Sequence, residues 1–304
     1  MAACICDPPS LQWQNGDHVT EVLSQGSPSG QRRISLQKSL ALDFPSTWRR
    51  EVSGSDSPAS PSRFPLPIGH SLAEKLGGGR TGVVYRIVRS SDGESLAAKC
   101  VQYLDEEVRK ITIQEYELLS SLKHSGIVQA YSLLCTDSSM CLLLEFCEQG
   151  SMQQYLEQNG LFEEKSALGL FRQLIGAVDF LHQRRIVHRD IKPDNCLLKD
   201  GARALKLTDF NSAKVIGQGV GSTVMLSERG TKDFSAPELL LGGLWNERVD
   251  IWASGLCLYF MLRGSHPWTS FQHAKKAFMA GCLPQALQLQ AADFSAEWVR
   301  VCED

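Results

Sequence analysis

The chain has 304 residues, and its 31 lysines and arginines against 34 aspartates and glutamates give a formal net charge of −3. This balance argues against a mainly electrostatic nucleic-acid binder and rules out polybasic adhesion to a membrane, since both need a strong excess of positive charge. We therefore expect no nucleic-acid and no membrane partner. No apolar run approaches the roughly 20 residues of a spanning helix. The ten cysteines lack metal-ligand spacing, which indicates reduced thiols in an intracellular protein, cytoplasmic or nuclear.

Residues 1–68 differ in composition from the rest of the chain. They hold eight of the twelve prolines and many serines, in stretches such as SQGSPSG and SGSDSPASPS. A segment of this kind buries too little apolar surface to offset the conformational entropy that it would lose on folding. We therefore predict a disordered leader over 1–68.

From about residue 69 the sequence becomes periodic. Short β-type runs separated by Gly, Ser and Asp predict strands, and the first three of them an antiparallel meander. These runs occupy 70–76, 82–90, 95–104, 127–134 and 139–147. Between the third and the fourth run, apolar residues at helical spacing predict a helix over 106–124.

After Gly150 the predicted structure is mainly helical. The segments 161–185 and 248–264 are long and strongly apolar on at least one side, as expected of helices that pack into a core. The sequence therefore predicts an α+β protein, with a small β-rich lobe followed by a larger helical lobe.

A glycine-rich segment, GGGRTGVV at 77–84, fits the pattern GxGxxGxV. Glycines let a strand–turn–strand unit approach phosphates closely, with free backbone N–H groups directed at them. Strand-like sequence follows, so the segment is not a dinucleotide-binding fingerprint, which needs a helix there. Taken alone, such a run of glycines is more often a flexible turn.

A lysine, Lys99, lies inside the apolar strand predicted over 95–104. Burial of an ammonium group without a partner is costly, so we expect an acidic partner on the helix that follows. Glu115 and Glu117 are the two candidates. The alternative is a lysine on the open face of an edge strand.

The segment HRDIKPDN at 188–195 combines basic, acidic and amide side chains in a tight loop between apolar runs. Its acid, Asp190, precedes Asn195 by five residues. This order can place a base beside a hydroxyl and an oxygen ligand beside a metal ion. An ordinary polar surface loop would not need this order of residue types.

Three shorter motifs follow along the chain: LKLTDFN at 205–211, SAPE at 235–238 and DIW at 250–252. In this order and spacing, the motifs together resemble the protein kinase family, from about residue 70 to the carboxyl end. The resemblance implies a bilobal kinase-like fold over 69–304. The N-lobe would cover about 69–145 and the C-lobe about 146–304.

The resemblance also implies an activity, the transfer of the γ-phosphate of Mg-ATP to a serine or threonine hydroxyl of a protein substrate. Lys192, two residues after Asp190, and Thr231 match the Ser/Thr-kinase form of the pattern. The segments HQRRIVHRDIKPDN and GSHPW are most similar to the calcium/calmodulin-dependent kinase group. A small-molecule kinase of the same fold fits less well, because the SAPE segment is typical of peptide recognition.

Nucleotide-binding roles are implied at the positions that match the family's motifs. They cover the phosphates, both faces of the adenine ring and the hinge backbone, at Gly77, Gly79, Gly82, Val84, Ala97, Leu197, Glu145 and Cys147. Leu144 would be the gatekeeper. Lys99 would hold the α- and β-phosphates and pair with the helix acid, for which Glu115 fits the family spacing better than Glu117.

Catalytic and metal-binding roles are implied in the same way. Asp190 would be the base that orients the acceptor hydroxyl and accepts its proton. Lys192 would stabilise charge on the transferring phosphoryl group. Asn195 and Asp209 would hold the Mg²⁺ ions that neutralise the phosphates, so ATP and Mg²⁺ are the implied cofactors.

Arg189 immediately precedes Asp190, which in this family implies control through phosphorylation of the activation segment by an upstream kinase. A phosphate on Ser227 could pair with Arg189 and order that segment. Thr231 would help to fix Asp190 and Lys192. The alternative is a segment that is ordered without a phosphate.

The sequence departs from the family pattern at two places. Asn211 replaces the glycine of the expected DFG, and asparagine is the next most tolerant residue for left-handed backbone geometry. The chain also stops at Asp304, before the final helices and the arginine that would pair with Glu238, so we expect a truncated C-lobe. Either the sequence is a fragment, or the C-lobe is less stable than in related kinases. A pseudokinase that binds nucleotide or acts as a scaffold, with weak or no turnover, is therefore the alternative function.

Overall fold

A computed structural model describes residues 64–280, except 80–81, 103–105, 137, 217–231 and 269–270. It also describes two short strands, β1 (Gln12–Trp13) and β2 (Val19–Thr20), which pair antiparallel. The rest of the predicted leader and residues 281–304 lie outside the described residues. Disorder of the undescribed part of the leader and truncation of the C-lobe therefore stay predictions, whereas 64–68, the end of the predicted leader, are described and pack in part against the sheet.

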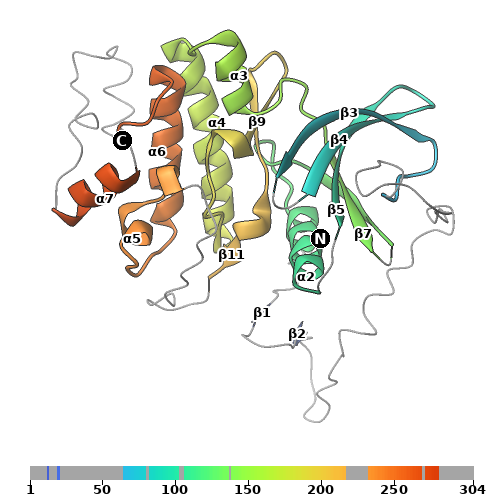
Figure 1. The fold of residues 1–304 in the computed structure, drawn as a ribbon, viewed down its shortest axis with the longest axis horizontal. Helices are drawn as coiled ribbons and strands as arrows, with labels where there is room; N and C mark the ends of the chain where they lie inside the picture. The colour runs from blue at the N-terminus through green and yellow to red at the C-terminus, as the bar shows by residue number, and fades with distance from the viewer. Residues whose placement is uncertain are drawn as a thin grey trace, which may run out of the picture. The chain divides into compact units, whose positions relative to one another are not determined.

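The smaller lobe is a five-stranded antiparallel sheet in the order β3-β4-β5-β7-β6, with one helix, α2, packed against it (Figure 1). Its elements are β3 (His70–Gly79), β4 (Gly82–Arg89), β5 (Ser95–Gln102), α2 (Glu106–Ser121), β6 (Ala130–Cys135) and β7 (Ser139–Glu145). The predicted meander, helix and two further strands are all confirmed. Strand β5 lies at the centre of the sheet, so Lys99 is not on an edge strand.

The larger lobe is mainly helical. Its helices are α3 (Met152–Asn159), α4 (Glu164–Gln183), α5 (Pro237–Leu240), α6 (Arg248–Arg263) and α7 (Phe271–Met279). The long helices α4 and α6, both predicted, pack side by side (Figure 1). None of the helices in the described part of the chain is both long and apolar enough to cross a membrane.

Several short elements lie between α4 and α5 along the chain. They are the paired strands β8 (Ile186–Val187) with β11 (Lys214–Val215) and β9 (Cys196–Lys199) with β10 (Ala204–Leu207), and the 3-10 helices η3 (Pro193–Asn195), η4 (Phe210–Ser212) and η5 (Lys232–Phe234). With them the predicted α+β, bilobal fold class is confirmed.

One hydrophobic core joins the two lobes. It runs from Leu119 of α2 and Leu144 of β7 through Leu198 of β9 to Leu174 of α4 and Cys257 of α6. Because the same cluster packs against the inner face of the sheet and against the large helices, it fixes the junction at which the polar motifs meet.

A second cluster covers the outer face of the sheet. It is built from the buried residues Ile87, Ala98, Cys100, Leu134, Cys141 and Leu143. Phe64 and Leu66, from the segment before β3, pack against this cluster. The proline-rich flank therefore shields apolar sheet surface that water would otherwise contact.

The double variant F64A/L66A is expected to lose about 1–3 kcal/mol of stability, because two partly buried apolar side chains are removed from the outer cluster. Thermal unfolding should show a drop of roughly 2–4 °C for each kcal/mol lost. The matched control is I68A, a residue of the same segment whose side chain is 65 % exposed. A double variant that melts like I68A would contradict the packing role.

Candidate active site

The buried lysine of β5 pairs with the helix acid. The Nζ of Lys99 donates to both carboxylate oxygens of Glu115, at 2.8 Å each, and both side chains are almost completely buried. Glu117, the other candidate, is exposed on α2. Burial alone would lower the pKa of Lys99, but the carboxylates of Glu115 and Asp209 raise it above its ordinary value, so the ammonium is charged.

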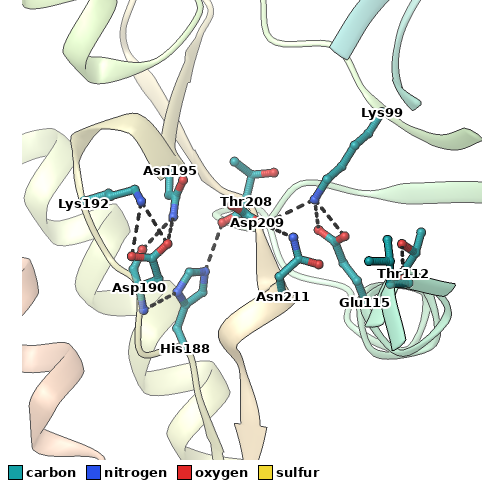
Figure 2. Close-up of polar contacts among 11 residues, drawn as sticks. Lys99, Thr112, Glu115, His188, Asp190, Lys192, Asn195, Thr208, Asp209 and Asn211 are labelled. Atoms are coloured by element: carbon teal, nitrogen blue, oxygen red, sulfur yellow. Dashed lines mark hydrogen bonds and ion pairs between the residues drawn. The ribbon is translucent and has the colours of Figure 1, made fainter. Parts of the chain in front are cut away.

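Asp209 lies next to this pair at the start of η4. Its backbone is left-handed, with φ 61° and ψ 72°, and its Oδ1 accepts a 3.3 Å hydrogen bond from Lys99 (Figure 2). Burial alone would raise the pKa of Asp209, but the charge of Lys99 holds it below the usual range. The carboxylate is therefore ionised and available to a cation.

The residue in left-handed geometry is thus Asp209, and Asn211 is not among the positive-φ residues. The tolerance of asparagine for left-handed backbone geometry is therefore not needed at position 211. Instead, Asn211 lies within η4 and its Nδ2 donates to Asp209 Oδ1 at 2.7 Å (Figure 2).

The loop between β8 and β9 brings three predicted residues together. The carboxylate of Asp190 accepts from Lys192 Nζ, 3.0 Å from Oδ2 and 3.3 Å from Oδ1. Asn195, at the end of η3, donates its Nδ2 to the same Oδ2 at 3.0 Å and to the Asp190 backbone carbonyl at 2.7 Å. In Figure 2 these three residues lie on one side of Asp209, and Lys99 and Glu115 lie on the other.

A buried acid that the sequence analysis gave no role holds this loop in place. The carboxylate of Asp250, at the start of α6, accepts from the backbone N–H groups of His188 and Arg189, both at 2.8 Å. It also lies 2.9 Å from Nε2 of His182 on α4. The DIW motif could have indicated this role, because an acidic residue at the start of an apolar helix needs hydrogen-bond partners when it is buried.

His188 connects this loop to the segment that carries Asp209. Its ring is fully buried, and Nε2 lies 3.0 Å from the Thr208 carbonyl. The ring meets Phe210 edge-on, with centroids 4.7 Å apart. The His188 side chain therefore ties the loop of Asp190 to the Asp209 segment.

The residues predicted to enclose the adenine ring share the main core. Ala97 belongs to it, and Val84 and Leu197 pack against it from the sheet and from β9. Leu144, the predicted gatekeeper, is buried opposite Ala97 in the sheet register. Burial, with the nearby Glu145, raises the pKa of the hinge thiol Cys147 to about 12, so this thiol is neutral.

Two backbone groups of the predicted hinge are used within the protein. The N–H of Glu145 donates to the Gln129 carbonyl at 2.9 Å, so any adenine contact of Glu145 must come from its carbonyl. The Cys147 carbonyl accepts from the N–H of Gly150 at 3.2 Å, which leaves the Cys147 N–H as the group to face adenine.

The side chain of Glu145 has a structural role that the sequence analysis missed. Its two oxygens pair with Lys199 at 2.9 Å and with Lys206 at 3.0 Å. Burial alone would raise the pKa of Glu145, but hydrogen bonds from the two lysines hold it below its ordinary value. The hinge is thereby attached to strands β9 and β10.

The glycine-rich segment forms the end of the β3–β4 hairpin. Gly77 pairs with Val84 and Gly79 with Gly82 across the two strands, and residues 80–81 between them lie outside the described residues. Gly82 has φ +132°, and a Cβ there would lie 2.5 Å from the Cys100 carbonyl oxygen. Glycine is therefore required at 82 by both conformation and space.

G82A is expected to cost roughly 1–3 kcal/mol, because alanine would be strained at this φ and would push β4 away from β5. Thermal unfolding without nucleotide measures the loss. The comparison is G77A, since a Cβ at Gly77 meets nothing within 4 Å. Equal melting temperatures for the two variants would refute the steric argument.

The residues present fit a magnesium–nucleotide site. No group of three or more His, Cys, Asp or Glu side chains that could hold a metal is found among the described residues. Mg²⁺ in such sites is commonly held by one or two carboxylates together with substrate phosphates. Asp209 offers a carboxylate, and Asn195, whose Nδ2 is used, offers its amide oxygen.

Two of the predicted regulatory residues, Ser227 and Thr231, lie outside the described residues. Arg189 is described: its Nε donates to the Ser212 carbonyl at 2.6 Å, and its guanidinium lies over the Trp245 ring, 5.3 Å from the centroid. Whether Arg189 also binds a phosphate on Ser227 stays a prediction.

Comparisons with known proteins agree with this geometry. Residues 70–301 match the family model described as the protein kinase domain. The chain is 31 % identical over 216 residues to a probable myosin light chain kinase of Dictyostelium discoideum, covering 70 % of this chain and 44 % of that protein. It is 32 % identical over 219 residues to the serine/threonine-protein kinase cds1 of Schizosaccharomyces pombe, covering 68 % and 47 %.

A third relative is the mitogen-activated protein kinase kinase kinase ANP1 of Arabidopsis thaliana, 32 % identical over 252 residues, with 78 % of this chain and 38 % of that protein covered. The chain thus spans less than half the length of these curated relatives. The matched region contains both lobes and all the motif residues described above. The chain therefore belongs to the protein kinase domain family.

Proposed function

We propose that the protein is an ATP-dependent serine/threonine kinase that phosphorylates a protein substrate. The observation that carries the proposal is the junction of the two lobes, where Lys99, held by Glu115, lies 3.3 Å from Asp209. The loop of Asp190, Lys192 and Asn195 faces the same space (Figure 2). Relatives named as serine/threonine kinases, and the DIKPDN form of the loop, support the choice of hydroxyl acceptor.

Each residue has a chemical task in this proposal. Lys99 binds the α- and β-phosphates, and Glu115 holds its ammonium in place. Asp190 orients the acceptor hydroxyl and accepts its proton, while Lys192, already 3.0 Å from Asp190, stabilises the charge of the transferring phosphoryl group. Mg²⁺, held by Asn195 and Asp209, would neutralise the phosphates.

The alternative is a pseudokinase that binds nucleotide without turnover. Asn211 and the predicted truncation of the C-lobe motivated it. The contact of Asn211 with Asp209 favours the enzyme, because it leaves the metal-binding carboxylate beside Lys99.

The test is incubation of the wild-type protein with Mg-ATP and Ser/Thr-containing peptides, with phosphosites mapped by mass spectrometry. The expected result is phosphoserine or phosphothreonine that forms only when Mg²⁺ is present. Absence of product from protein that carries a phosphate on Ser227, together with a melting temperature that rises with Mg-ATP, would establish the pseudokinase instead.

We further propose that the kinase acts inside the cell, in the cytoplasm or nucleus, and is activated by phosphorylation of Ser227. The support is chemical, since Arg189 precedes Asp190 and can pair with a phosphate. Active protein that carries no phosphate on Ser227, with an S227A variant of full activity, would refute the activation.

A further inference from the structure

Asn211 stands where the family pattern has a glycine, yet the backbone at 211 does not use the left-handed geometry that would call for one. Its side chain is instead used, since the Nδ2 donates to Asp209 Oδ1 at 2.7 Å. This is shorter than the 3.3 Å contact that Lys99 makes with the same oxygen.

The two contacts leave the carboxylate in a defined orientation. Both donors meet Oδ1, and among the described residues no donor is found at Oδ2. The Asp209 side chain is 31 % exposed, whereas that of Lys99 is 9 % exposed. Oδ1 of Asp209 is therefore held by the protein, which leaves Oδ2 as the oxygen that can face a cation.

The contact with Lys99 is the one that nucleotide binding would weaken. Under the proposed function the Lys99 ammonium turns to the phosphates, whose negative charge competes with Asp209. The amide of Asn211 carries no charge and comes from η4, the same element that follows Asp209. It can hold Oδ1 when Lys99 no longer does.

We propose that Asn211 is a positioning residue that holds the metal-binding carboxylate of Asp209 in place in the nucleotide-bound state. This inference rests on the proposed function, because it concerns the same metal–nucleotide site. A side chain that is already ordered does not lose rotamer freedom when a ligand binds, so an ordered Asp209 should bind the metal ion more tightly.

The experiment measures metal binding rather than turnover. Mn²⁺ serves as the probe, and its affinity for the protein–ADP complex is measured by electron paramagnetic resonance for wild type, N211A and N211G. The affinity for ADP in EDTA is measured beside it. We expect Mn²⁺ to bind about threefold to tenfold more weakly in both variants, with metal-free ADP affinity unchanged.

N211A separates the side chain from backbone freedom, since it removes the amide without introducing glycine. The control is N159A, which removes an exposed amide hydrogen bond to the Tyr155 carbonyl on α3. Wild-type Mn²⁺ affinity in N211A, or a weakening seen only in N211G, would overturn the inference. So would an equal loss of metal-free ADP affinity, which would indicate a general structural role.

The outcome also separates this inference from the proposed function. Wild-type protein that binds no Mn²⁺ with ADP would refute both. Wild-type protein that binds Mn²⁺ with ADP, beside an N211A variant of the same affinity, would refute only the role of Asn211.

Discussion

Replacing Asp190 by asparagine is expected to lower kcat for phosphoryl transfer by about 10²–10⁴-fold, with little change in Mg-ATP affinity. The substitution keeps the size of the side chain, and within the described part of the chain the side-chain contacts that it disturbs are those with Lys192 and Asn195. What is lost is the carboxylate that orients the acceptor hydroxyl and takes its proton. Steady-state kinetics with a peptide substrate, together with a nucleotide titration, measure the two quantities separately.

The control for this prediction is D179N, the same chemical change at an exposed position of α4. It should retain wild-type kcat. A D190N protein that transfers phosphate at the wild-type rate would show that Asp190 is not the base. A D190N protein that no longer binds Mg-ATP would show that its main role is structural.

Replacing Asp250 by asparagine is expected to destabilise the protein by about 2–5 kcal/mol and to lower phosphoryl transfer as well. The carboxylate of Asp250 is buried and accepts the N–H groups of His188 and Arg189, both at 2.8 Å. The amide of asparagine replaces one carboxylate oxygen by an NH₂ group, which cannot accept a hydrogen bond from the backbone N–H of His188 or Arg189. The buried N–H group left without a partner then carries its desolvation cost.

Thermal unfolding and kinetics of D250N measure the two effects. A decrease of roughly 2–4 °C per kcal/mol is expected for a domain of this size. Activity should fall because the backbone at 188–189 directly precedes Asp190. The exposed variant D179N again serves as the control, and a D250N protein with the same melting temperature as D179N would refute the role of the buried carboxylate.

Local sequence signals were sufficient for most of the secondary structure. Strands β3–β7 and helices α2, α4 and α6 each carry a full period of apolar residues, and each was predicted. The strands β8–β11 have two to four residues each, too few for a period to be seen. They form because the segments around them are held by the core.

For the candidate site, too, the sequence predicted some parts and not others. The residues in contiguous motifs, such as Asp190, Asn195 and Asp209, were found because their order along the chain is distinctive. Glu145 with Lys199 and Lys206 was not, since the three residues come from separate strands. Only the tertiary structure shows that the two ion pairs of Glu145 attach the hinge to β9 and β10.

By itself, the near-neutral sequence of 304 residues determined the lobes, the motif residues and the need of Lys99 for an acidic partner. The lobes follow from periodicity and the partner of Lys99 from the cost of burying a charge, whereas the motif residues were identified by their resemblance to the protein kinase family. The tertiary structure shows Glu115 as that partner, as the family spacing had favoured. It alone decided that Asp250 holds the loop of Asp190 and that the amide of Asn211 contacts Asp209. The first two contacts join residues from separate elements, 16 and 61–62 positions apart, which meet only when those elements pack on a common core. The amide of Asn211 reaches Asp209 because the chain turns in η4, a geometry that the residue types alone do not give.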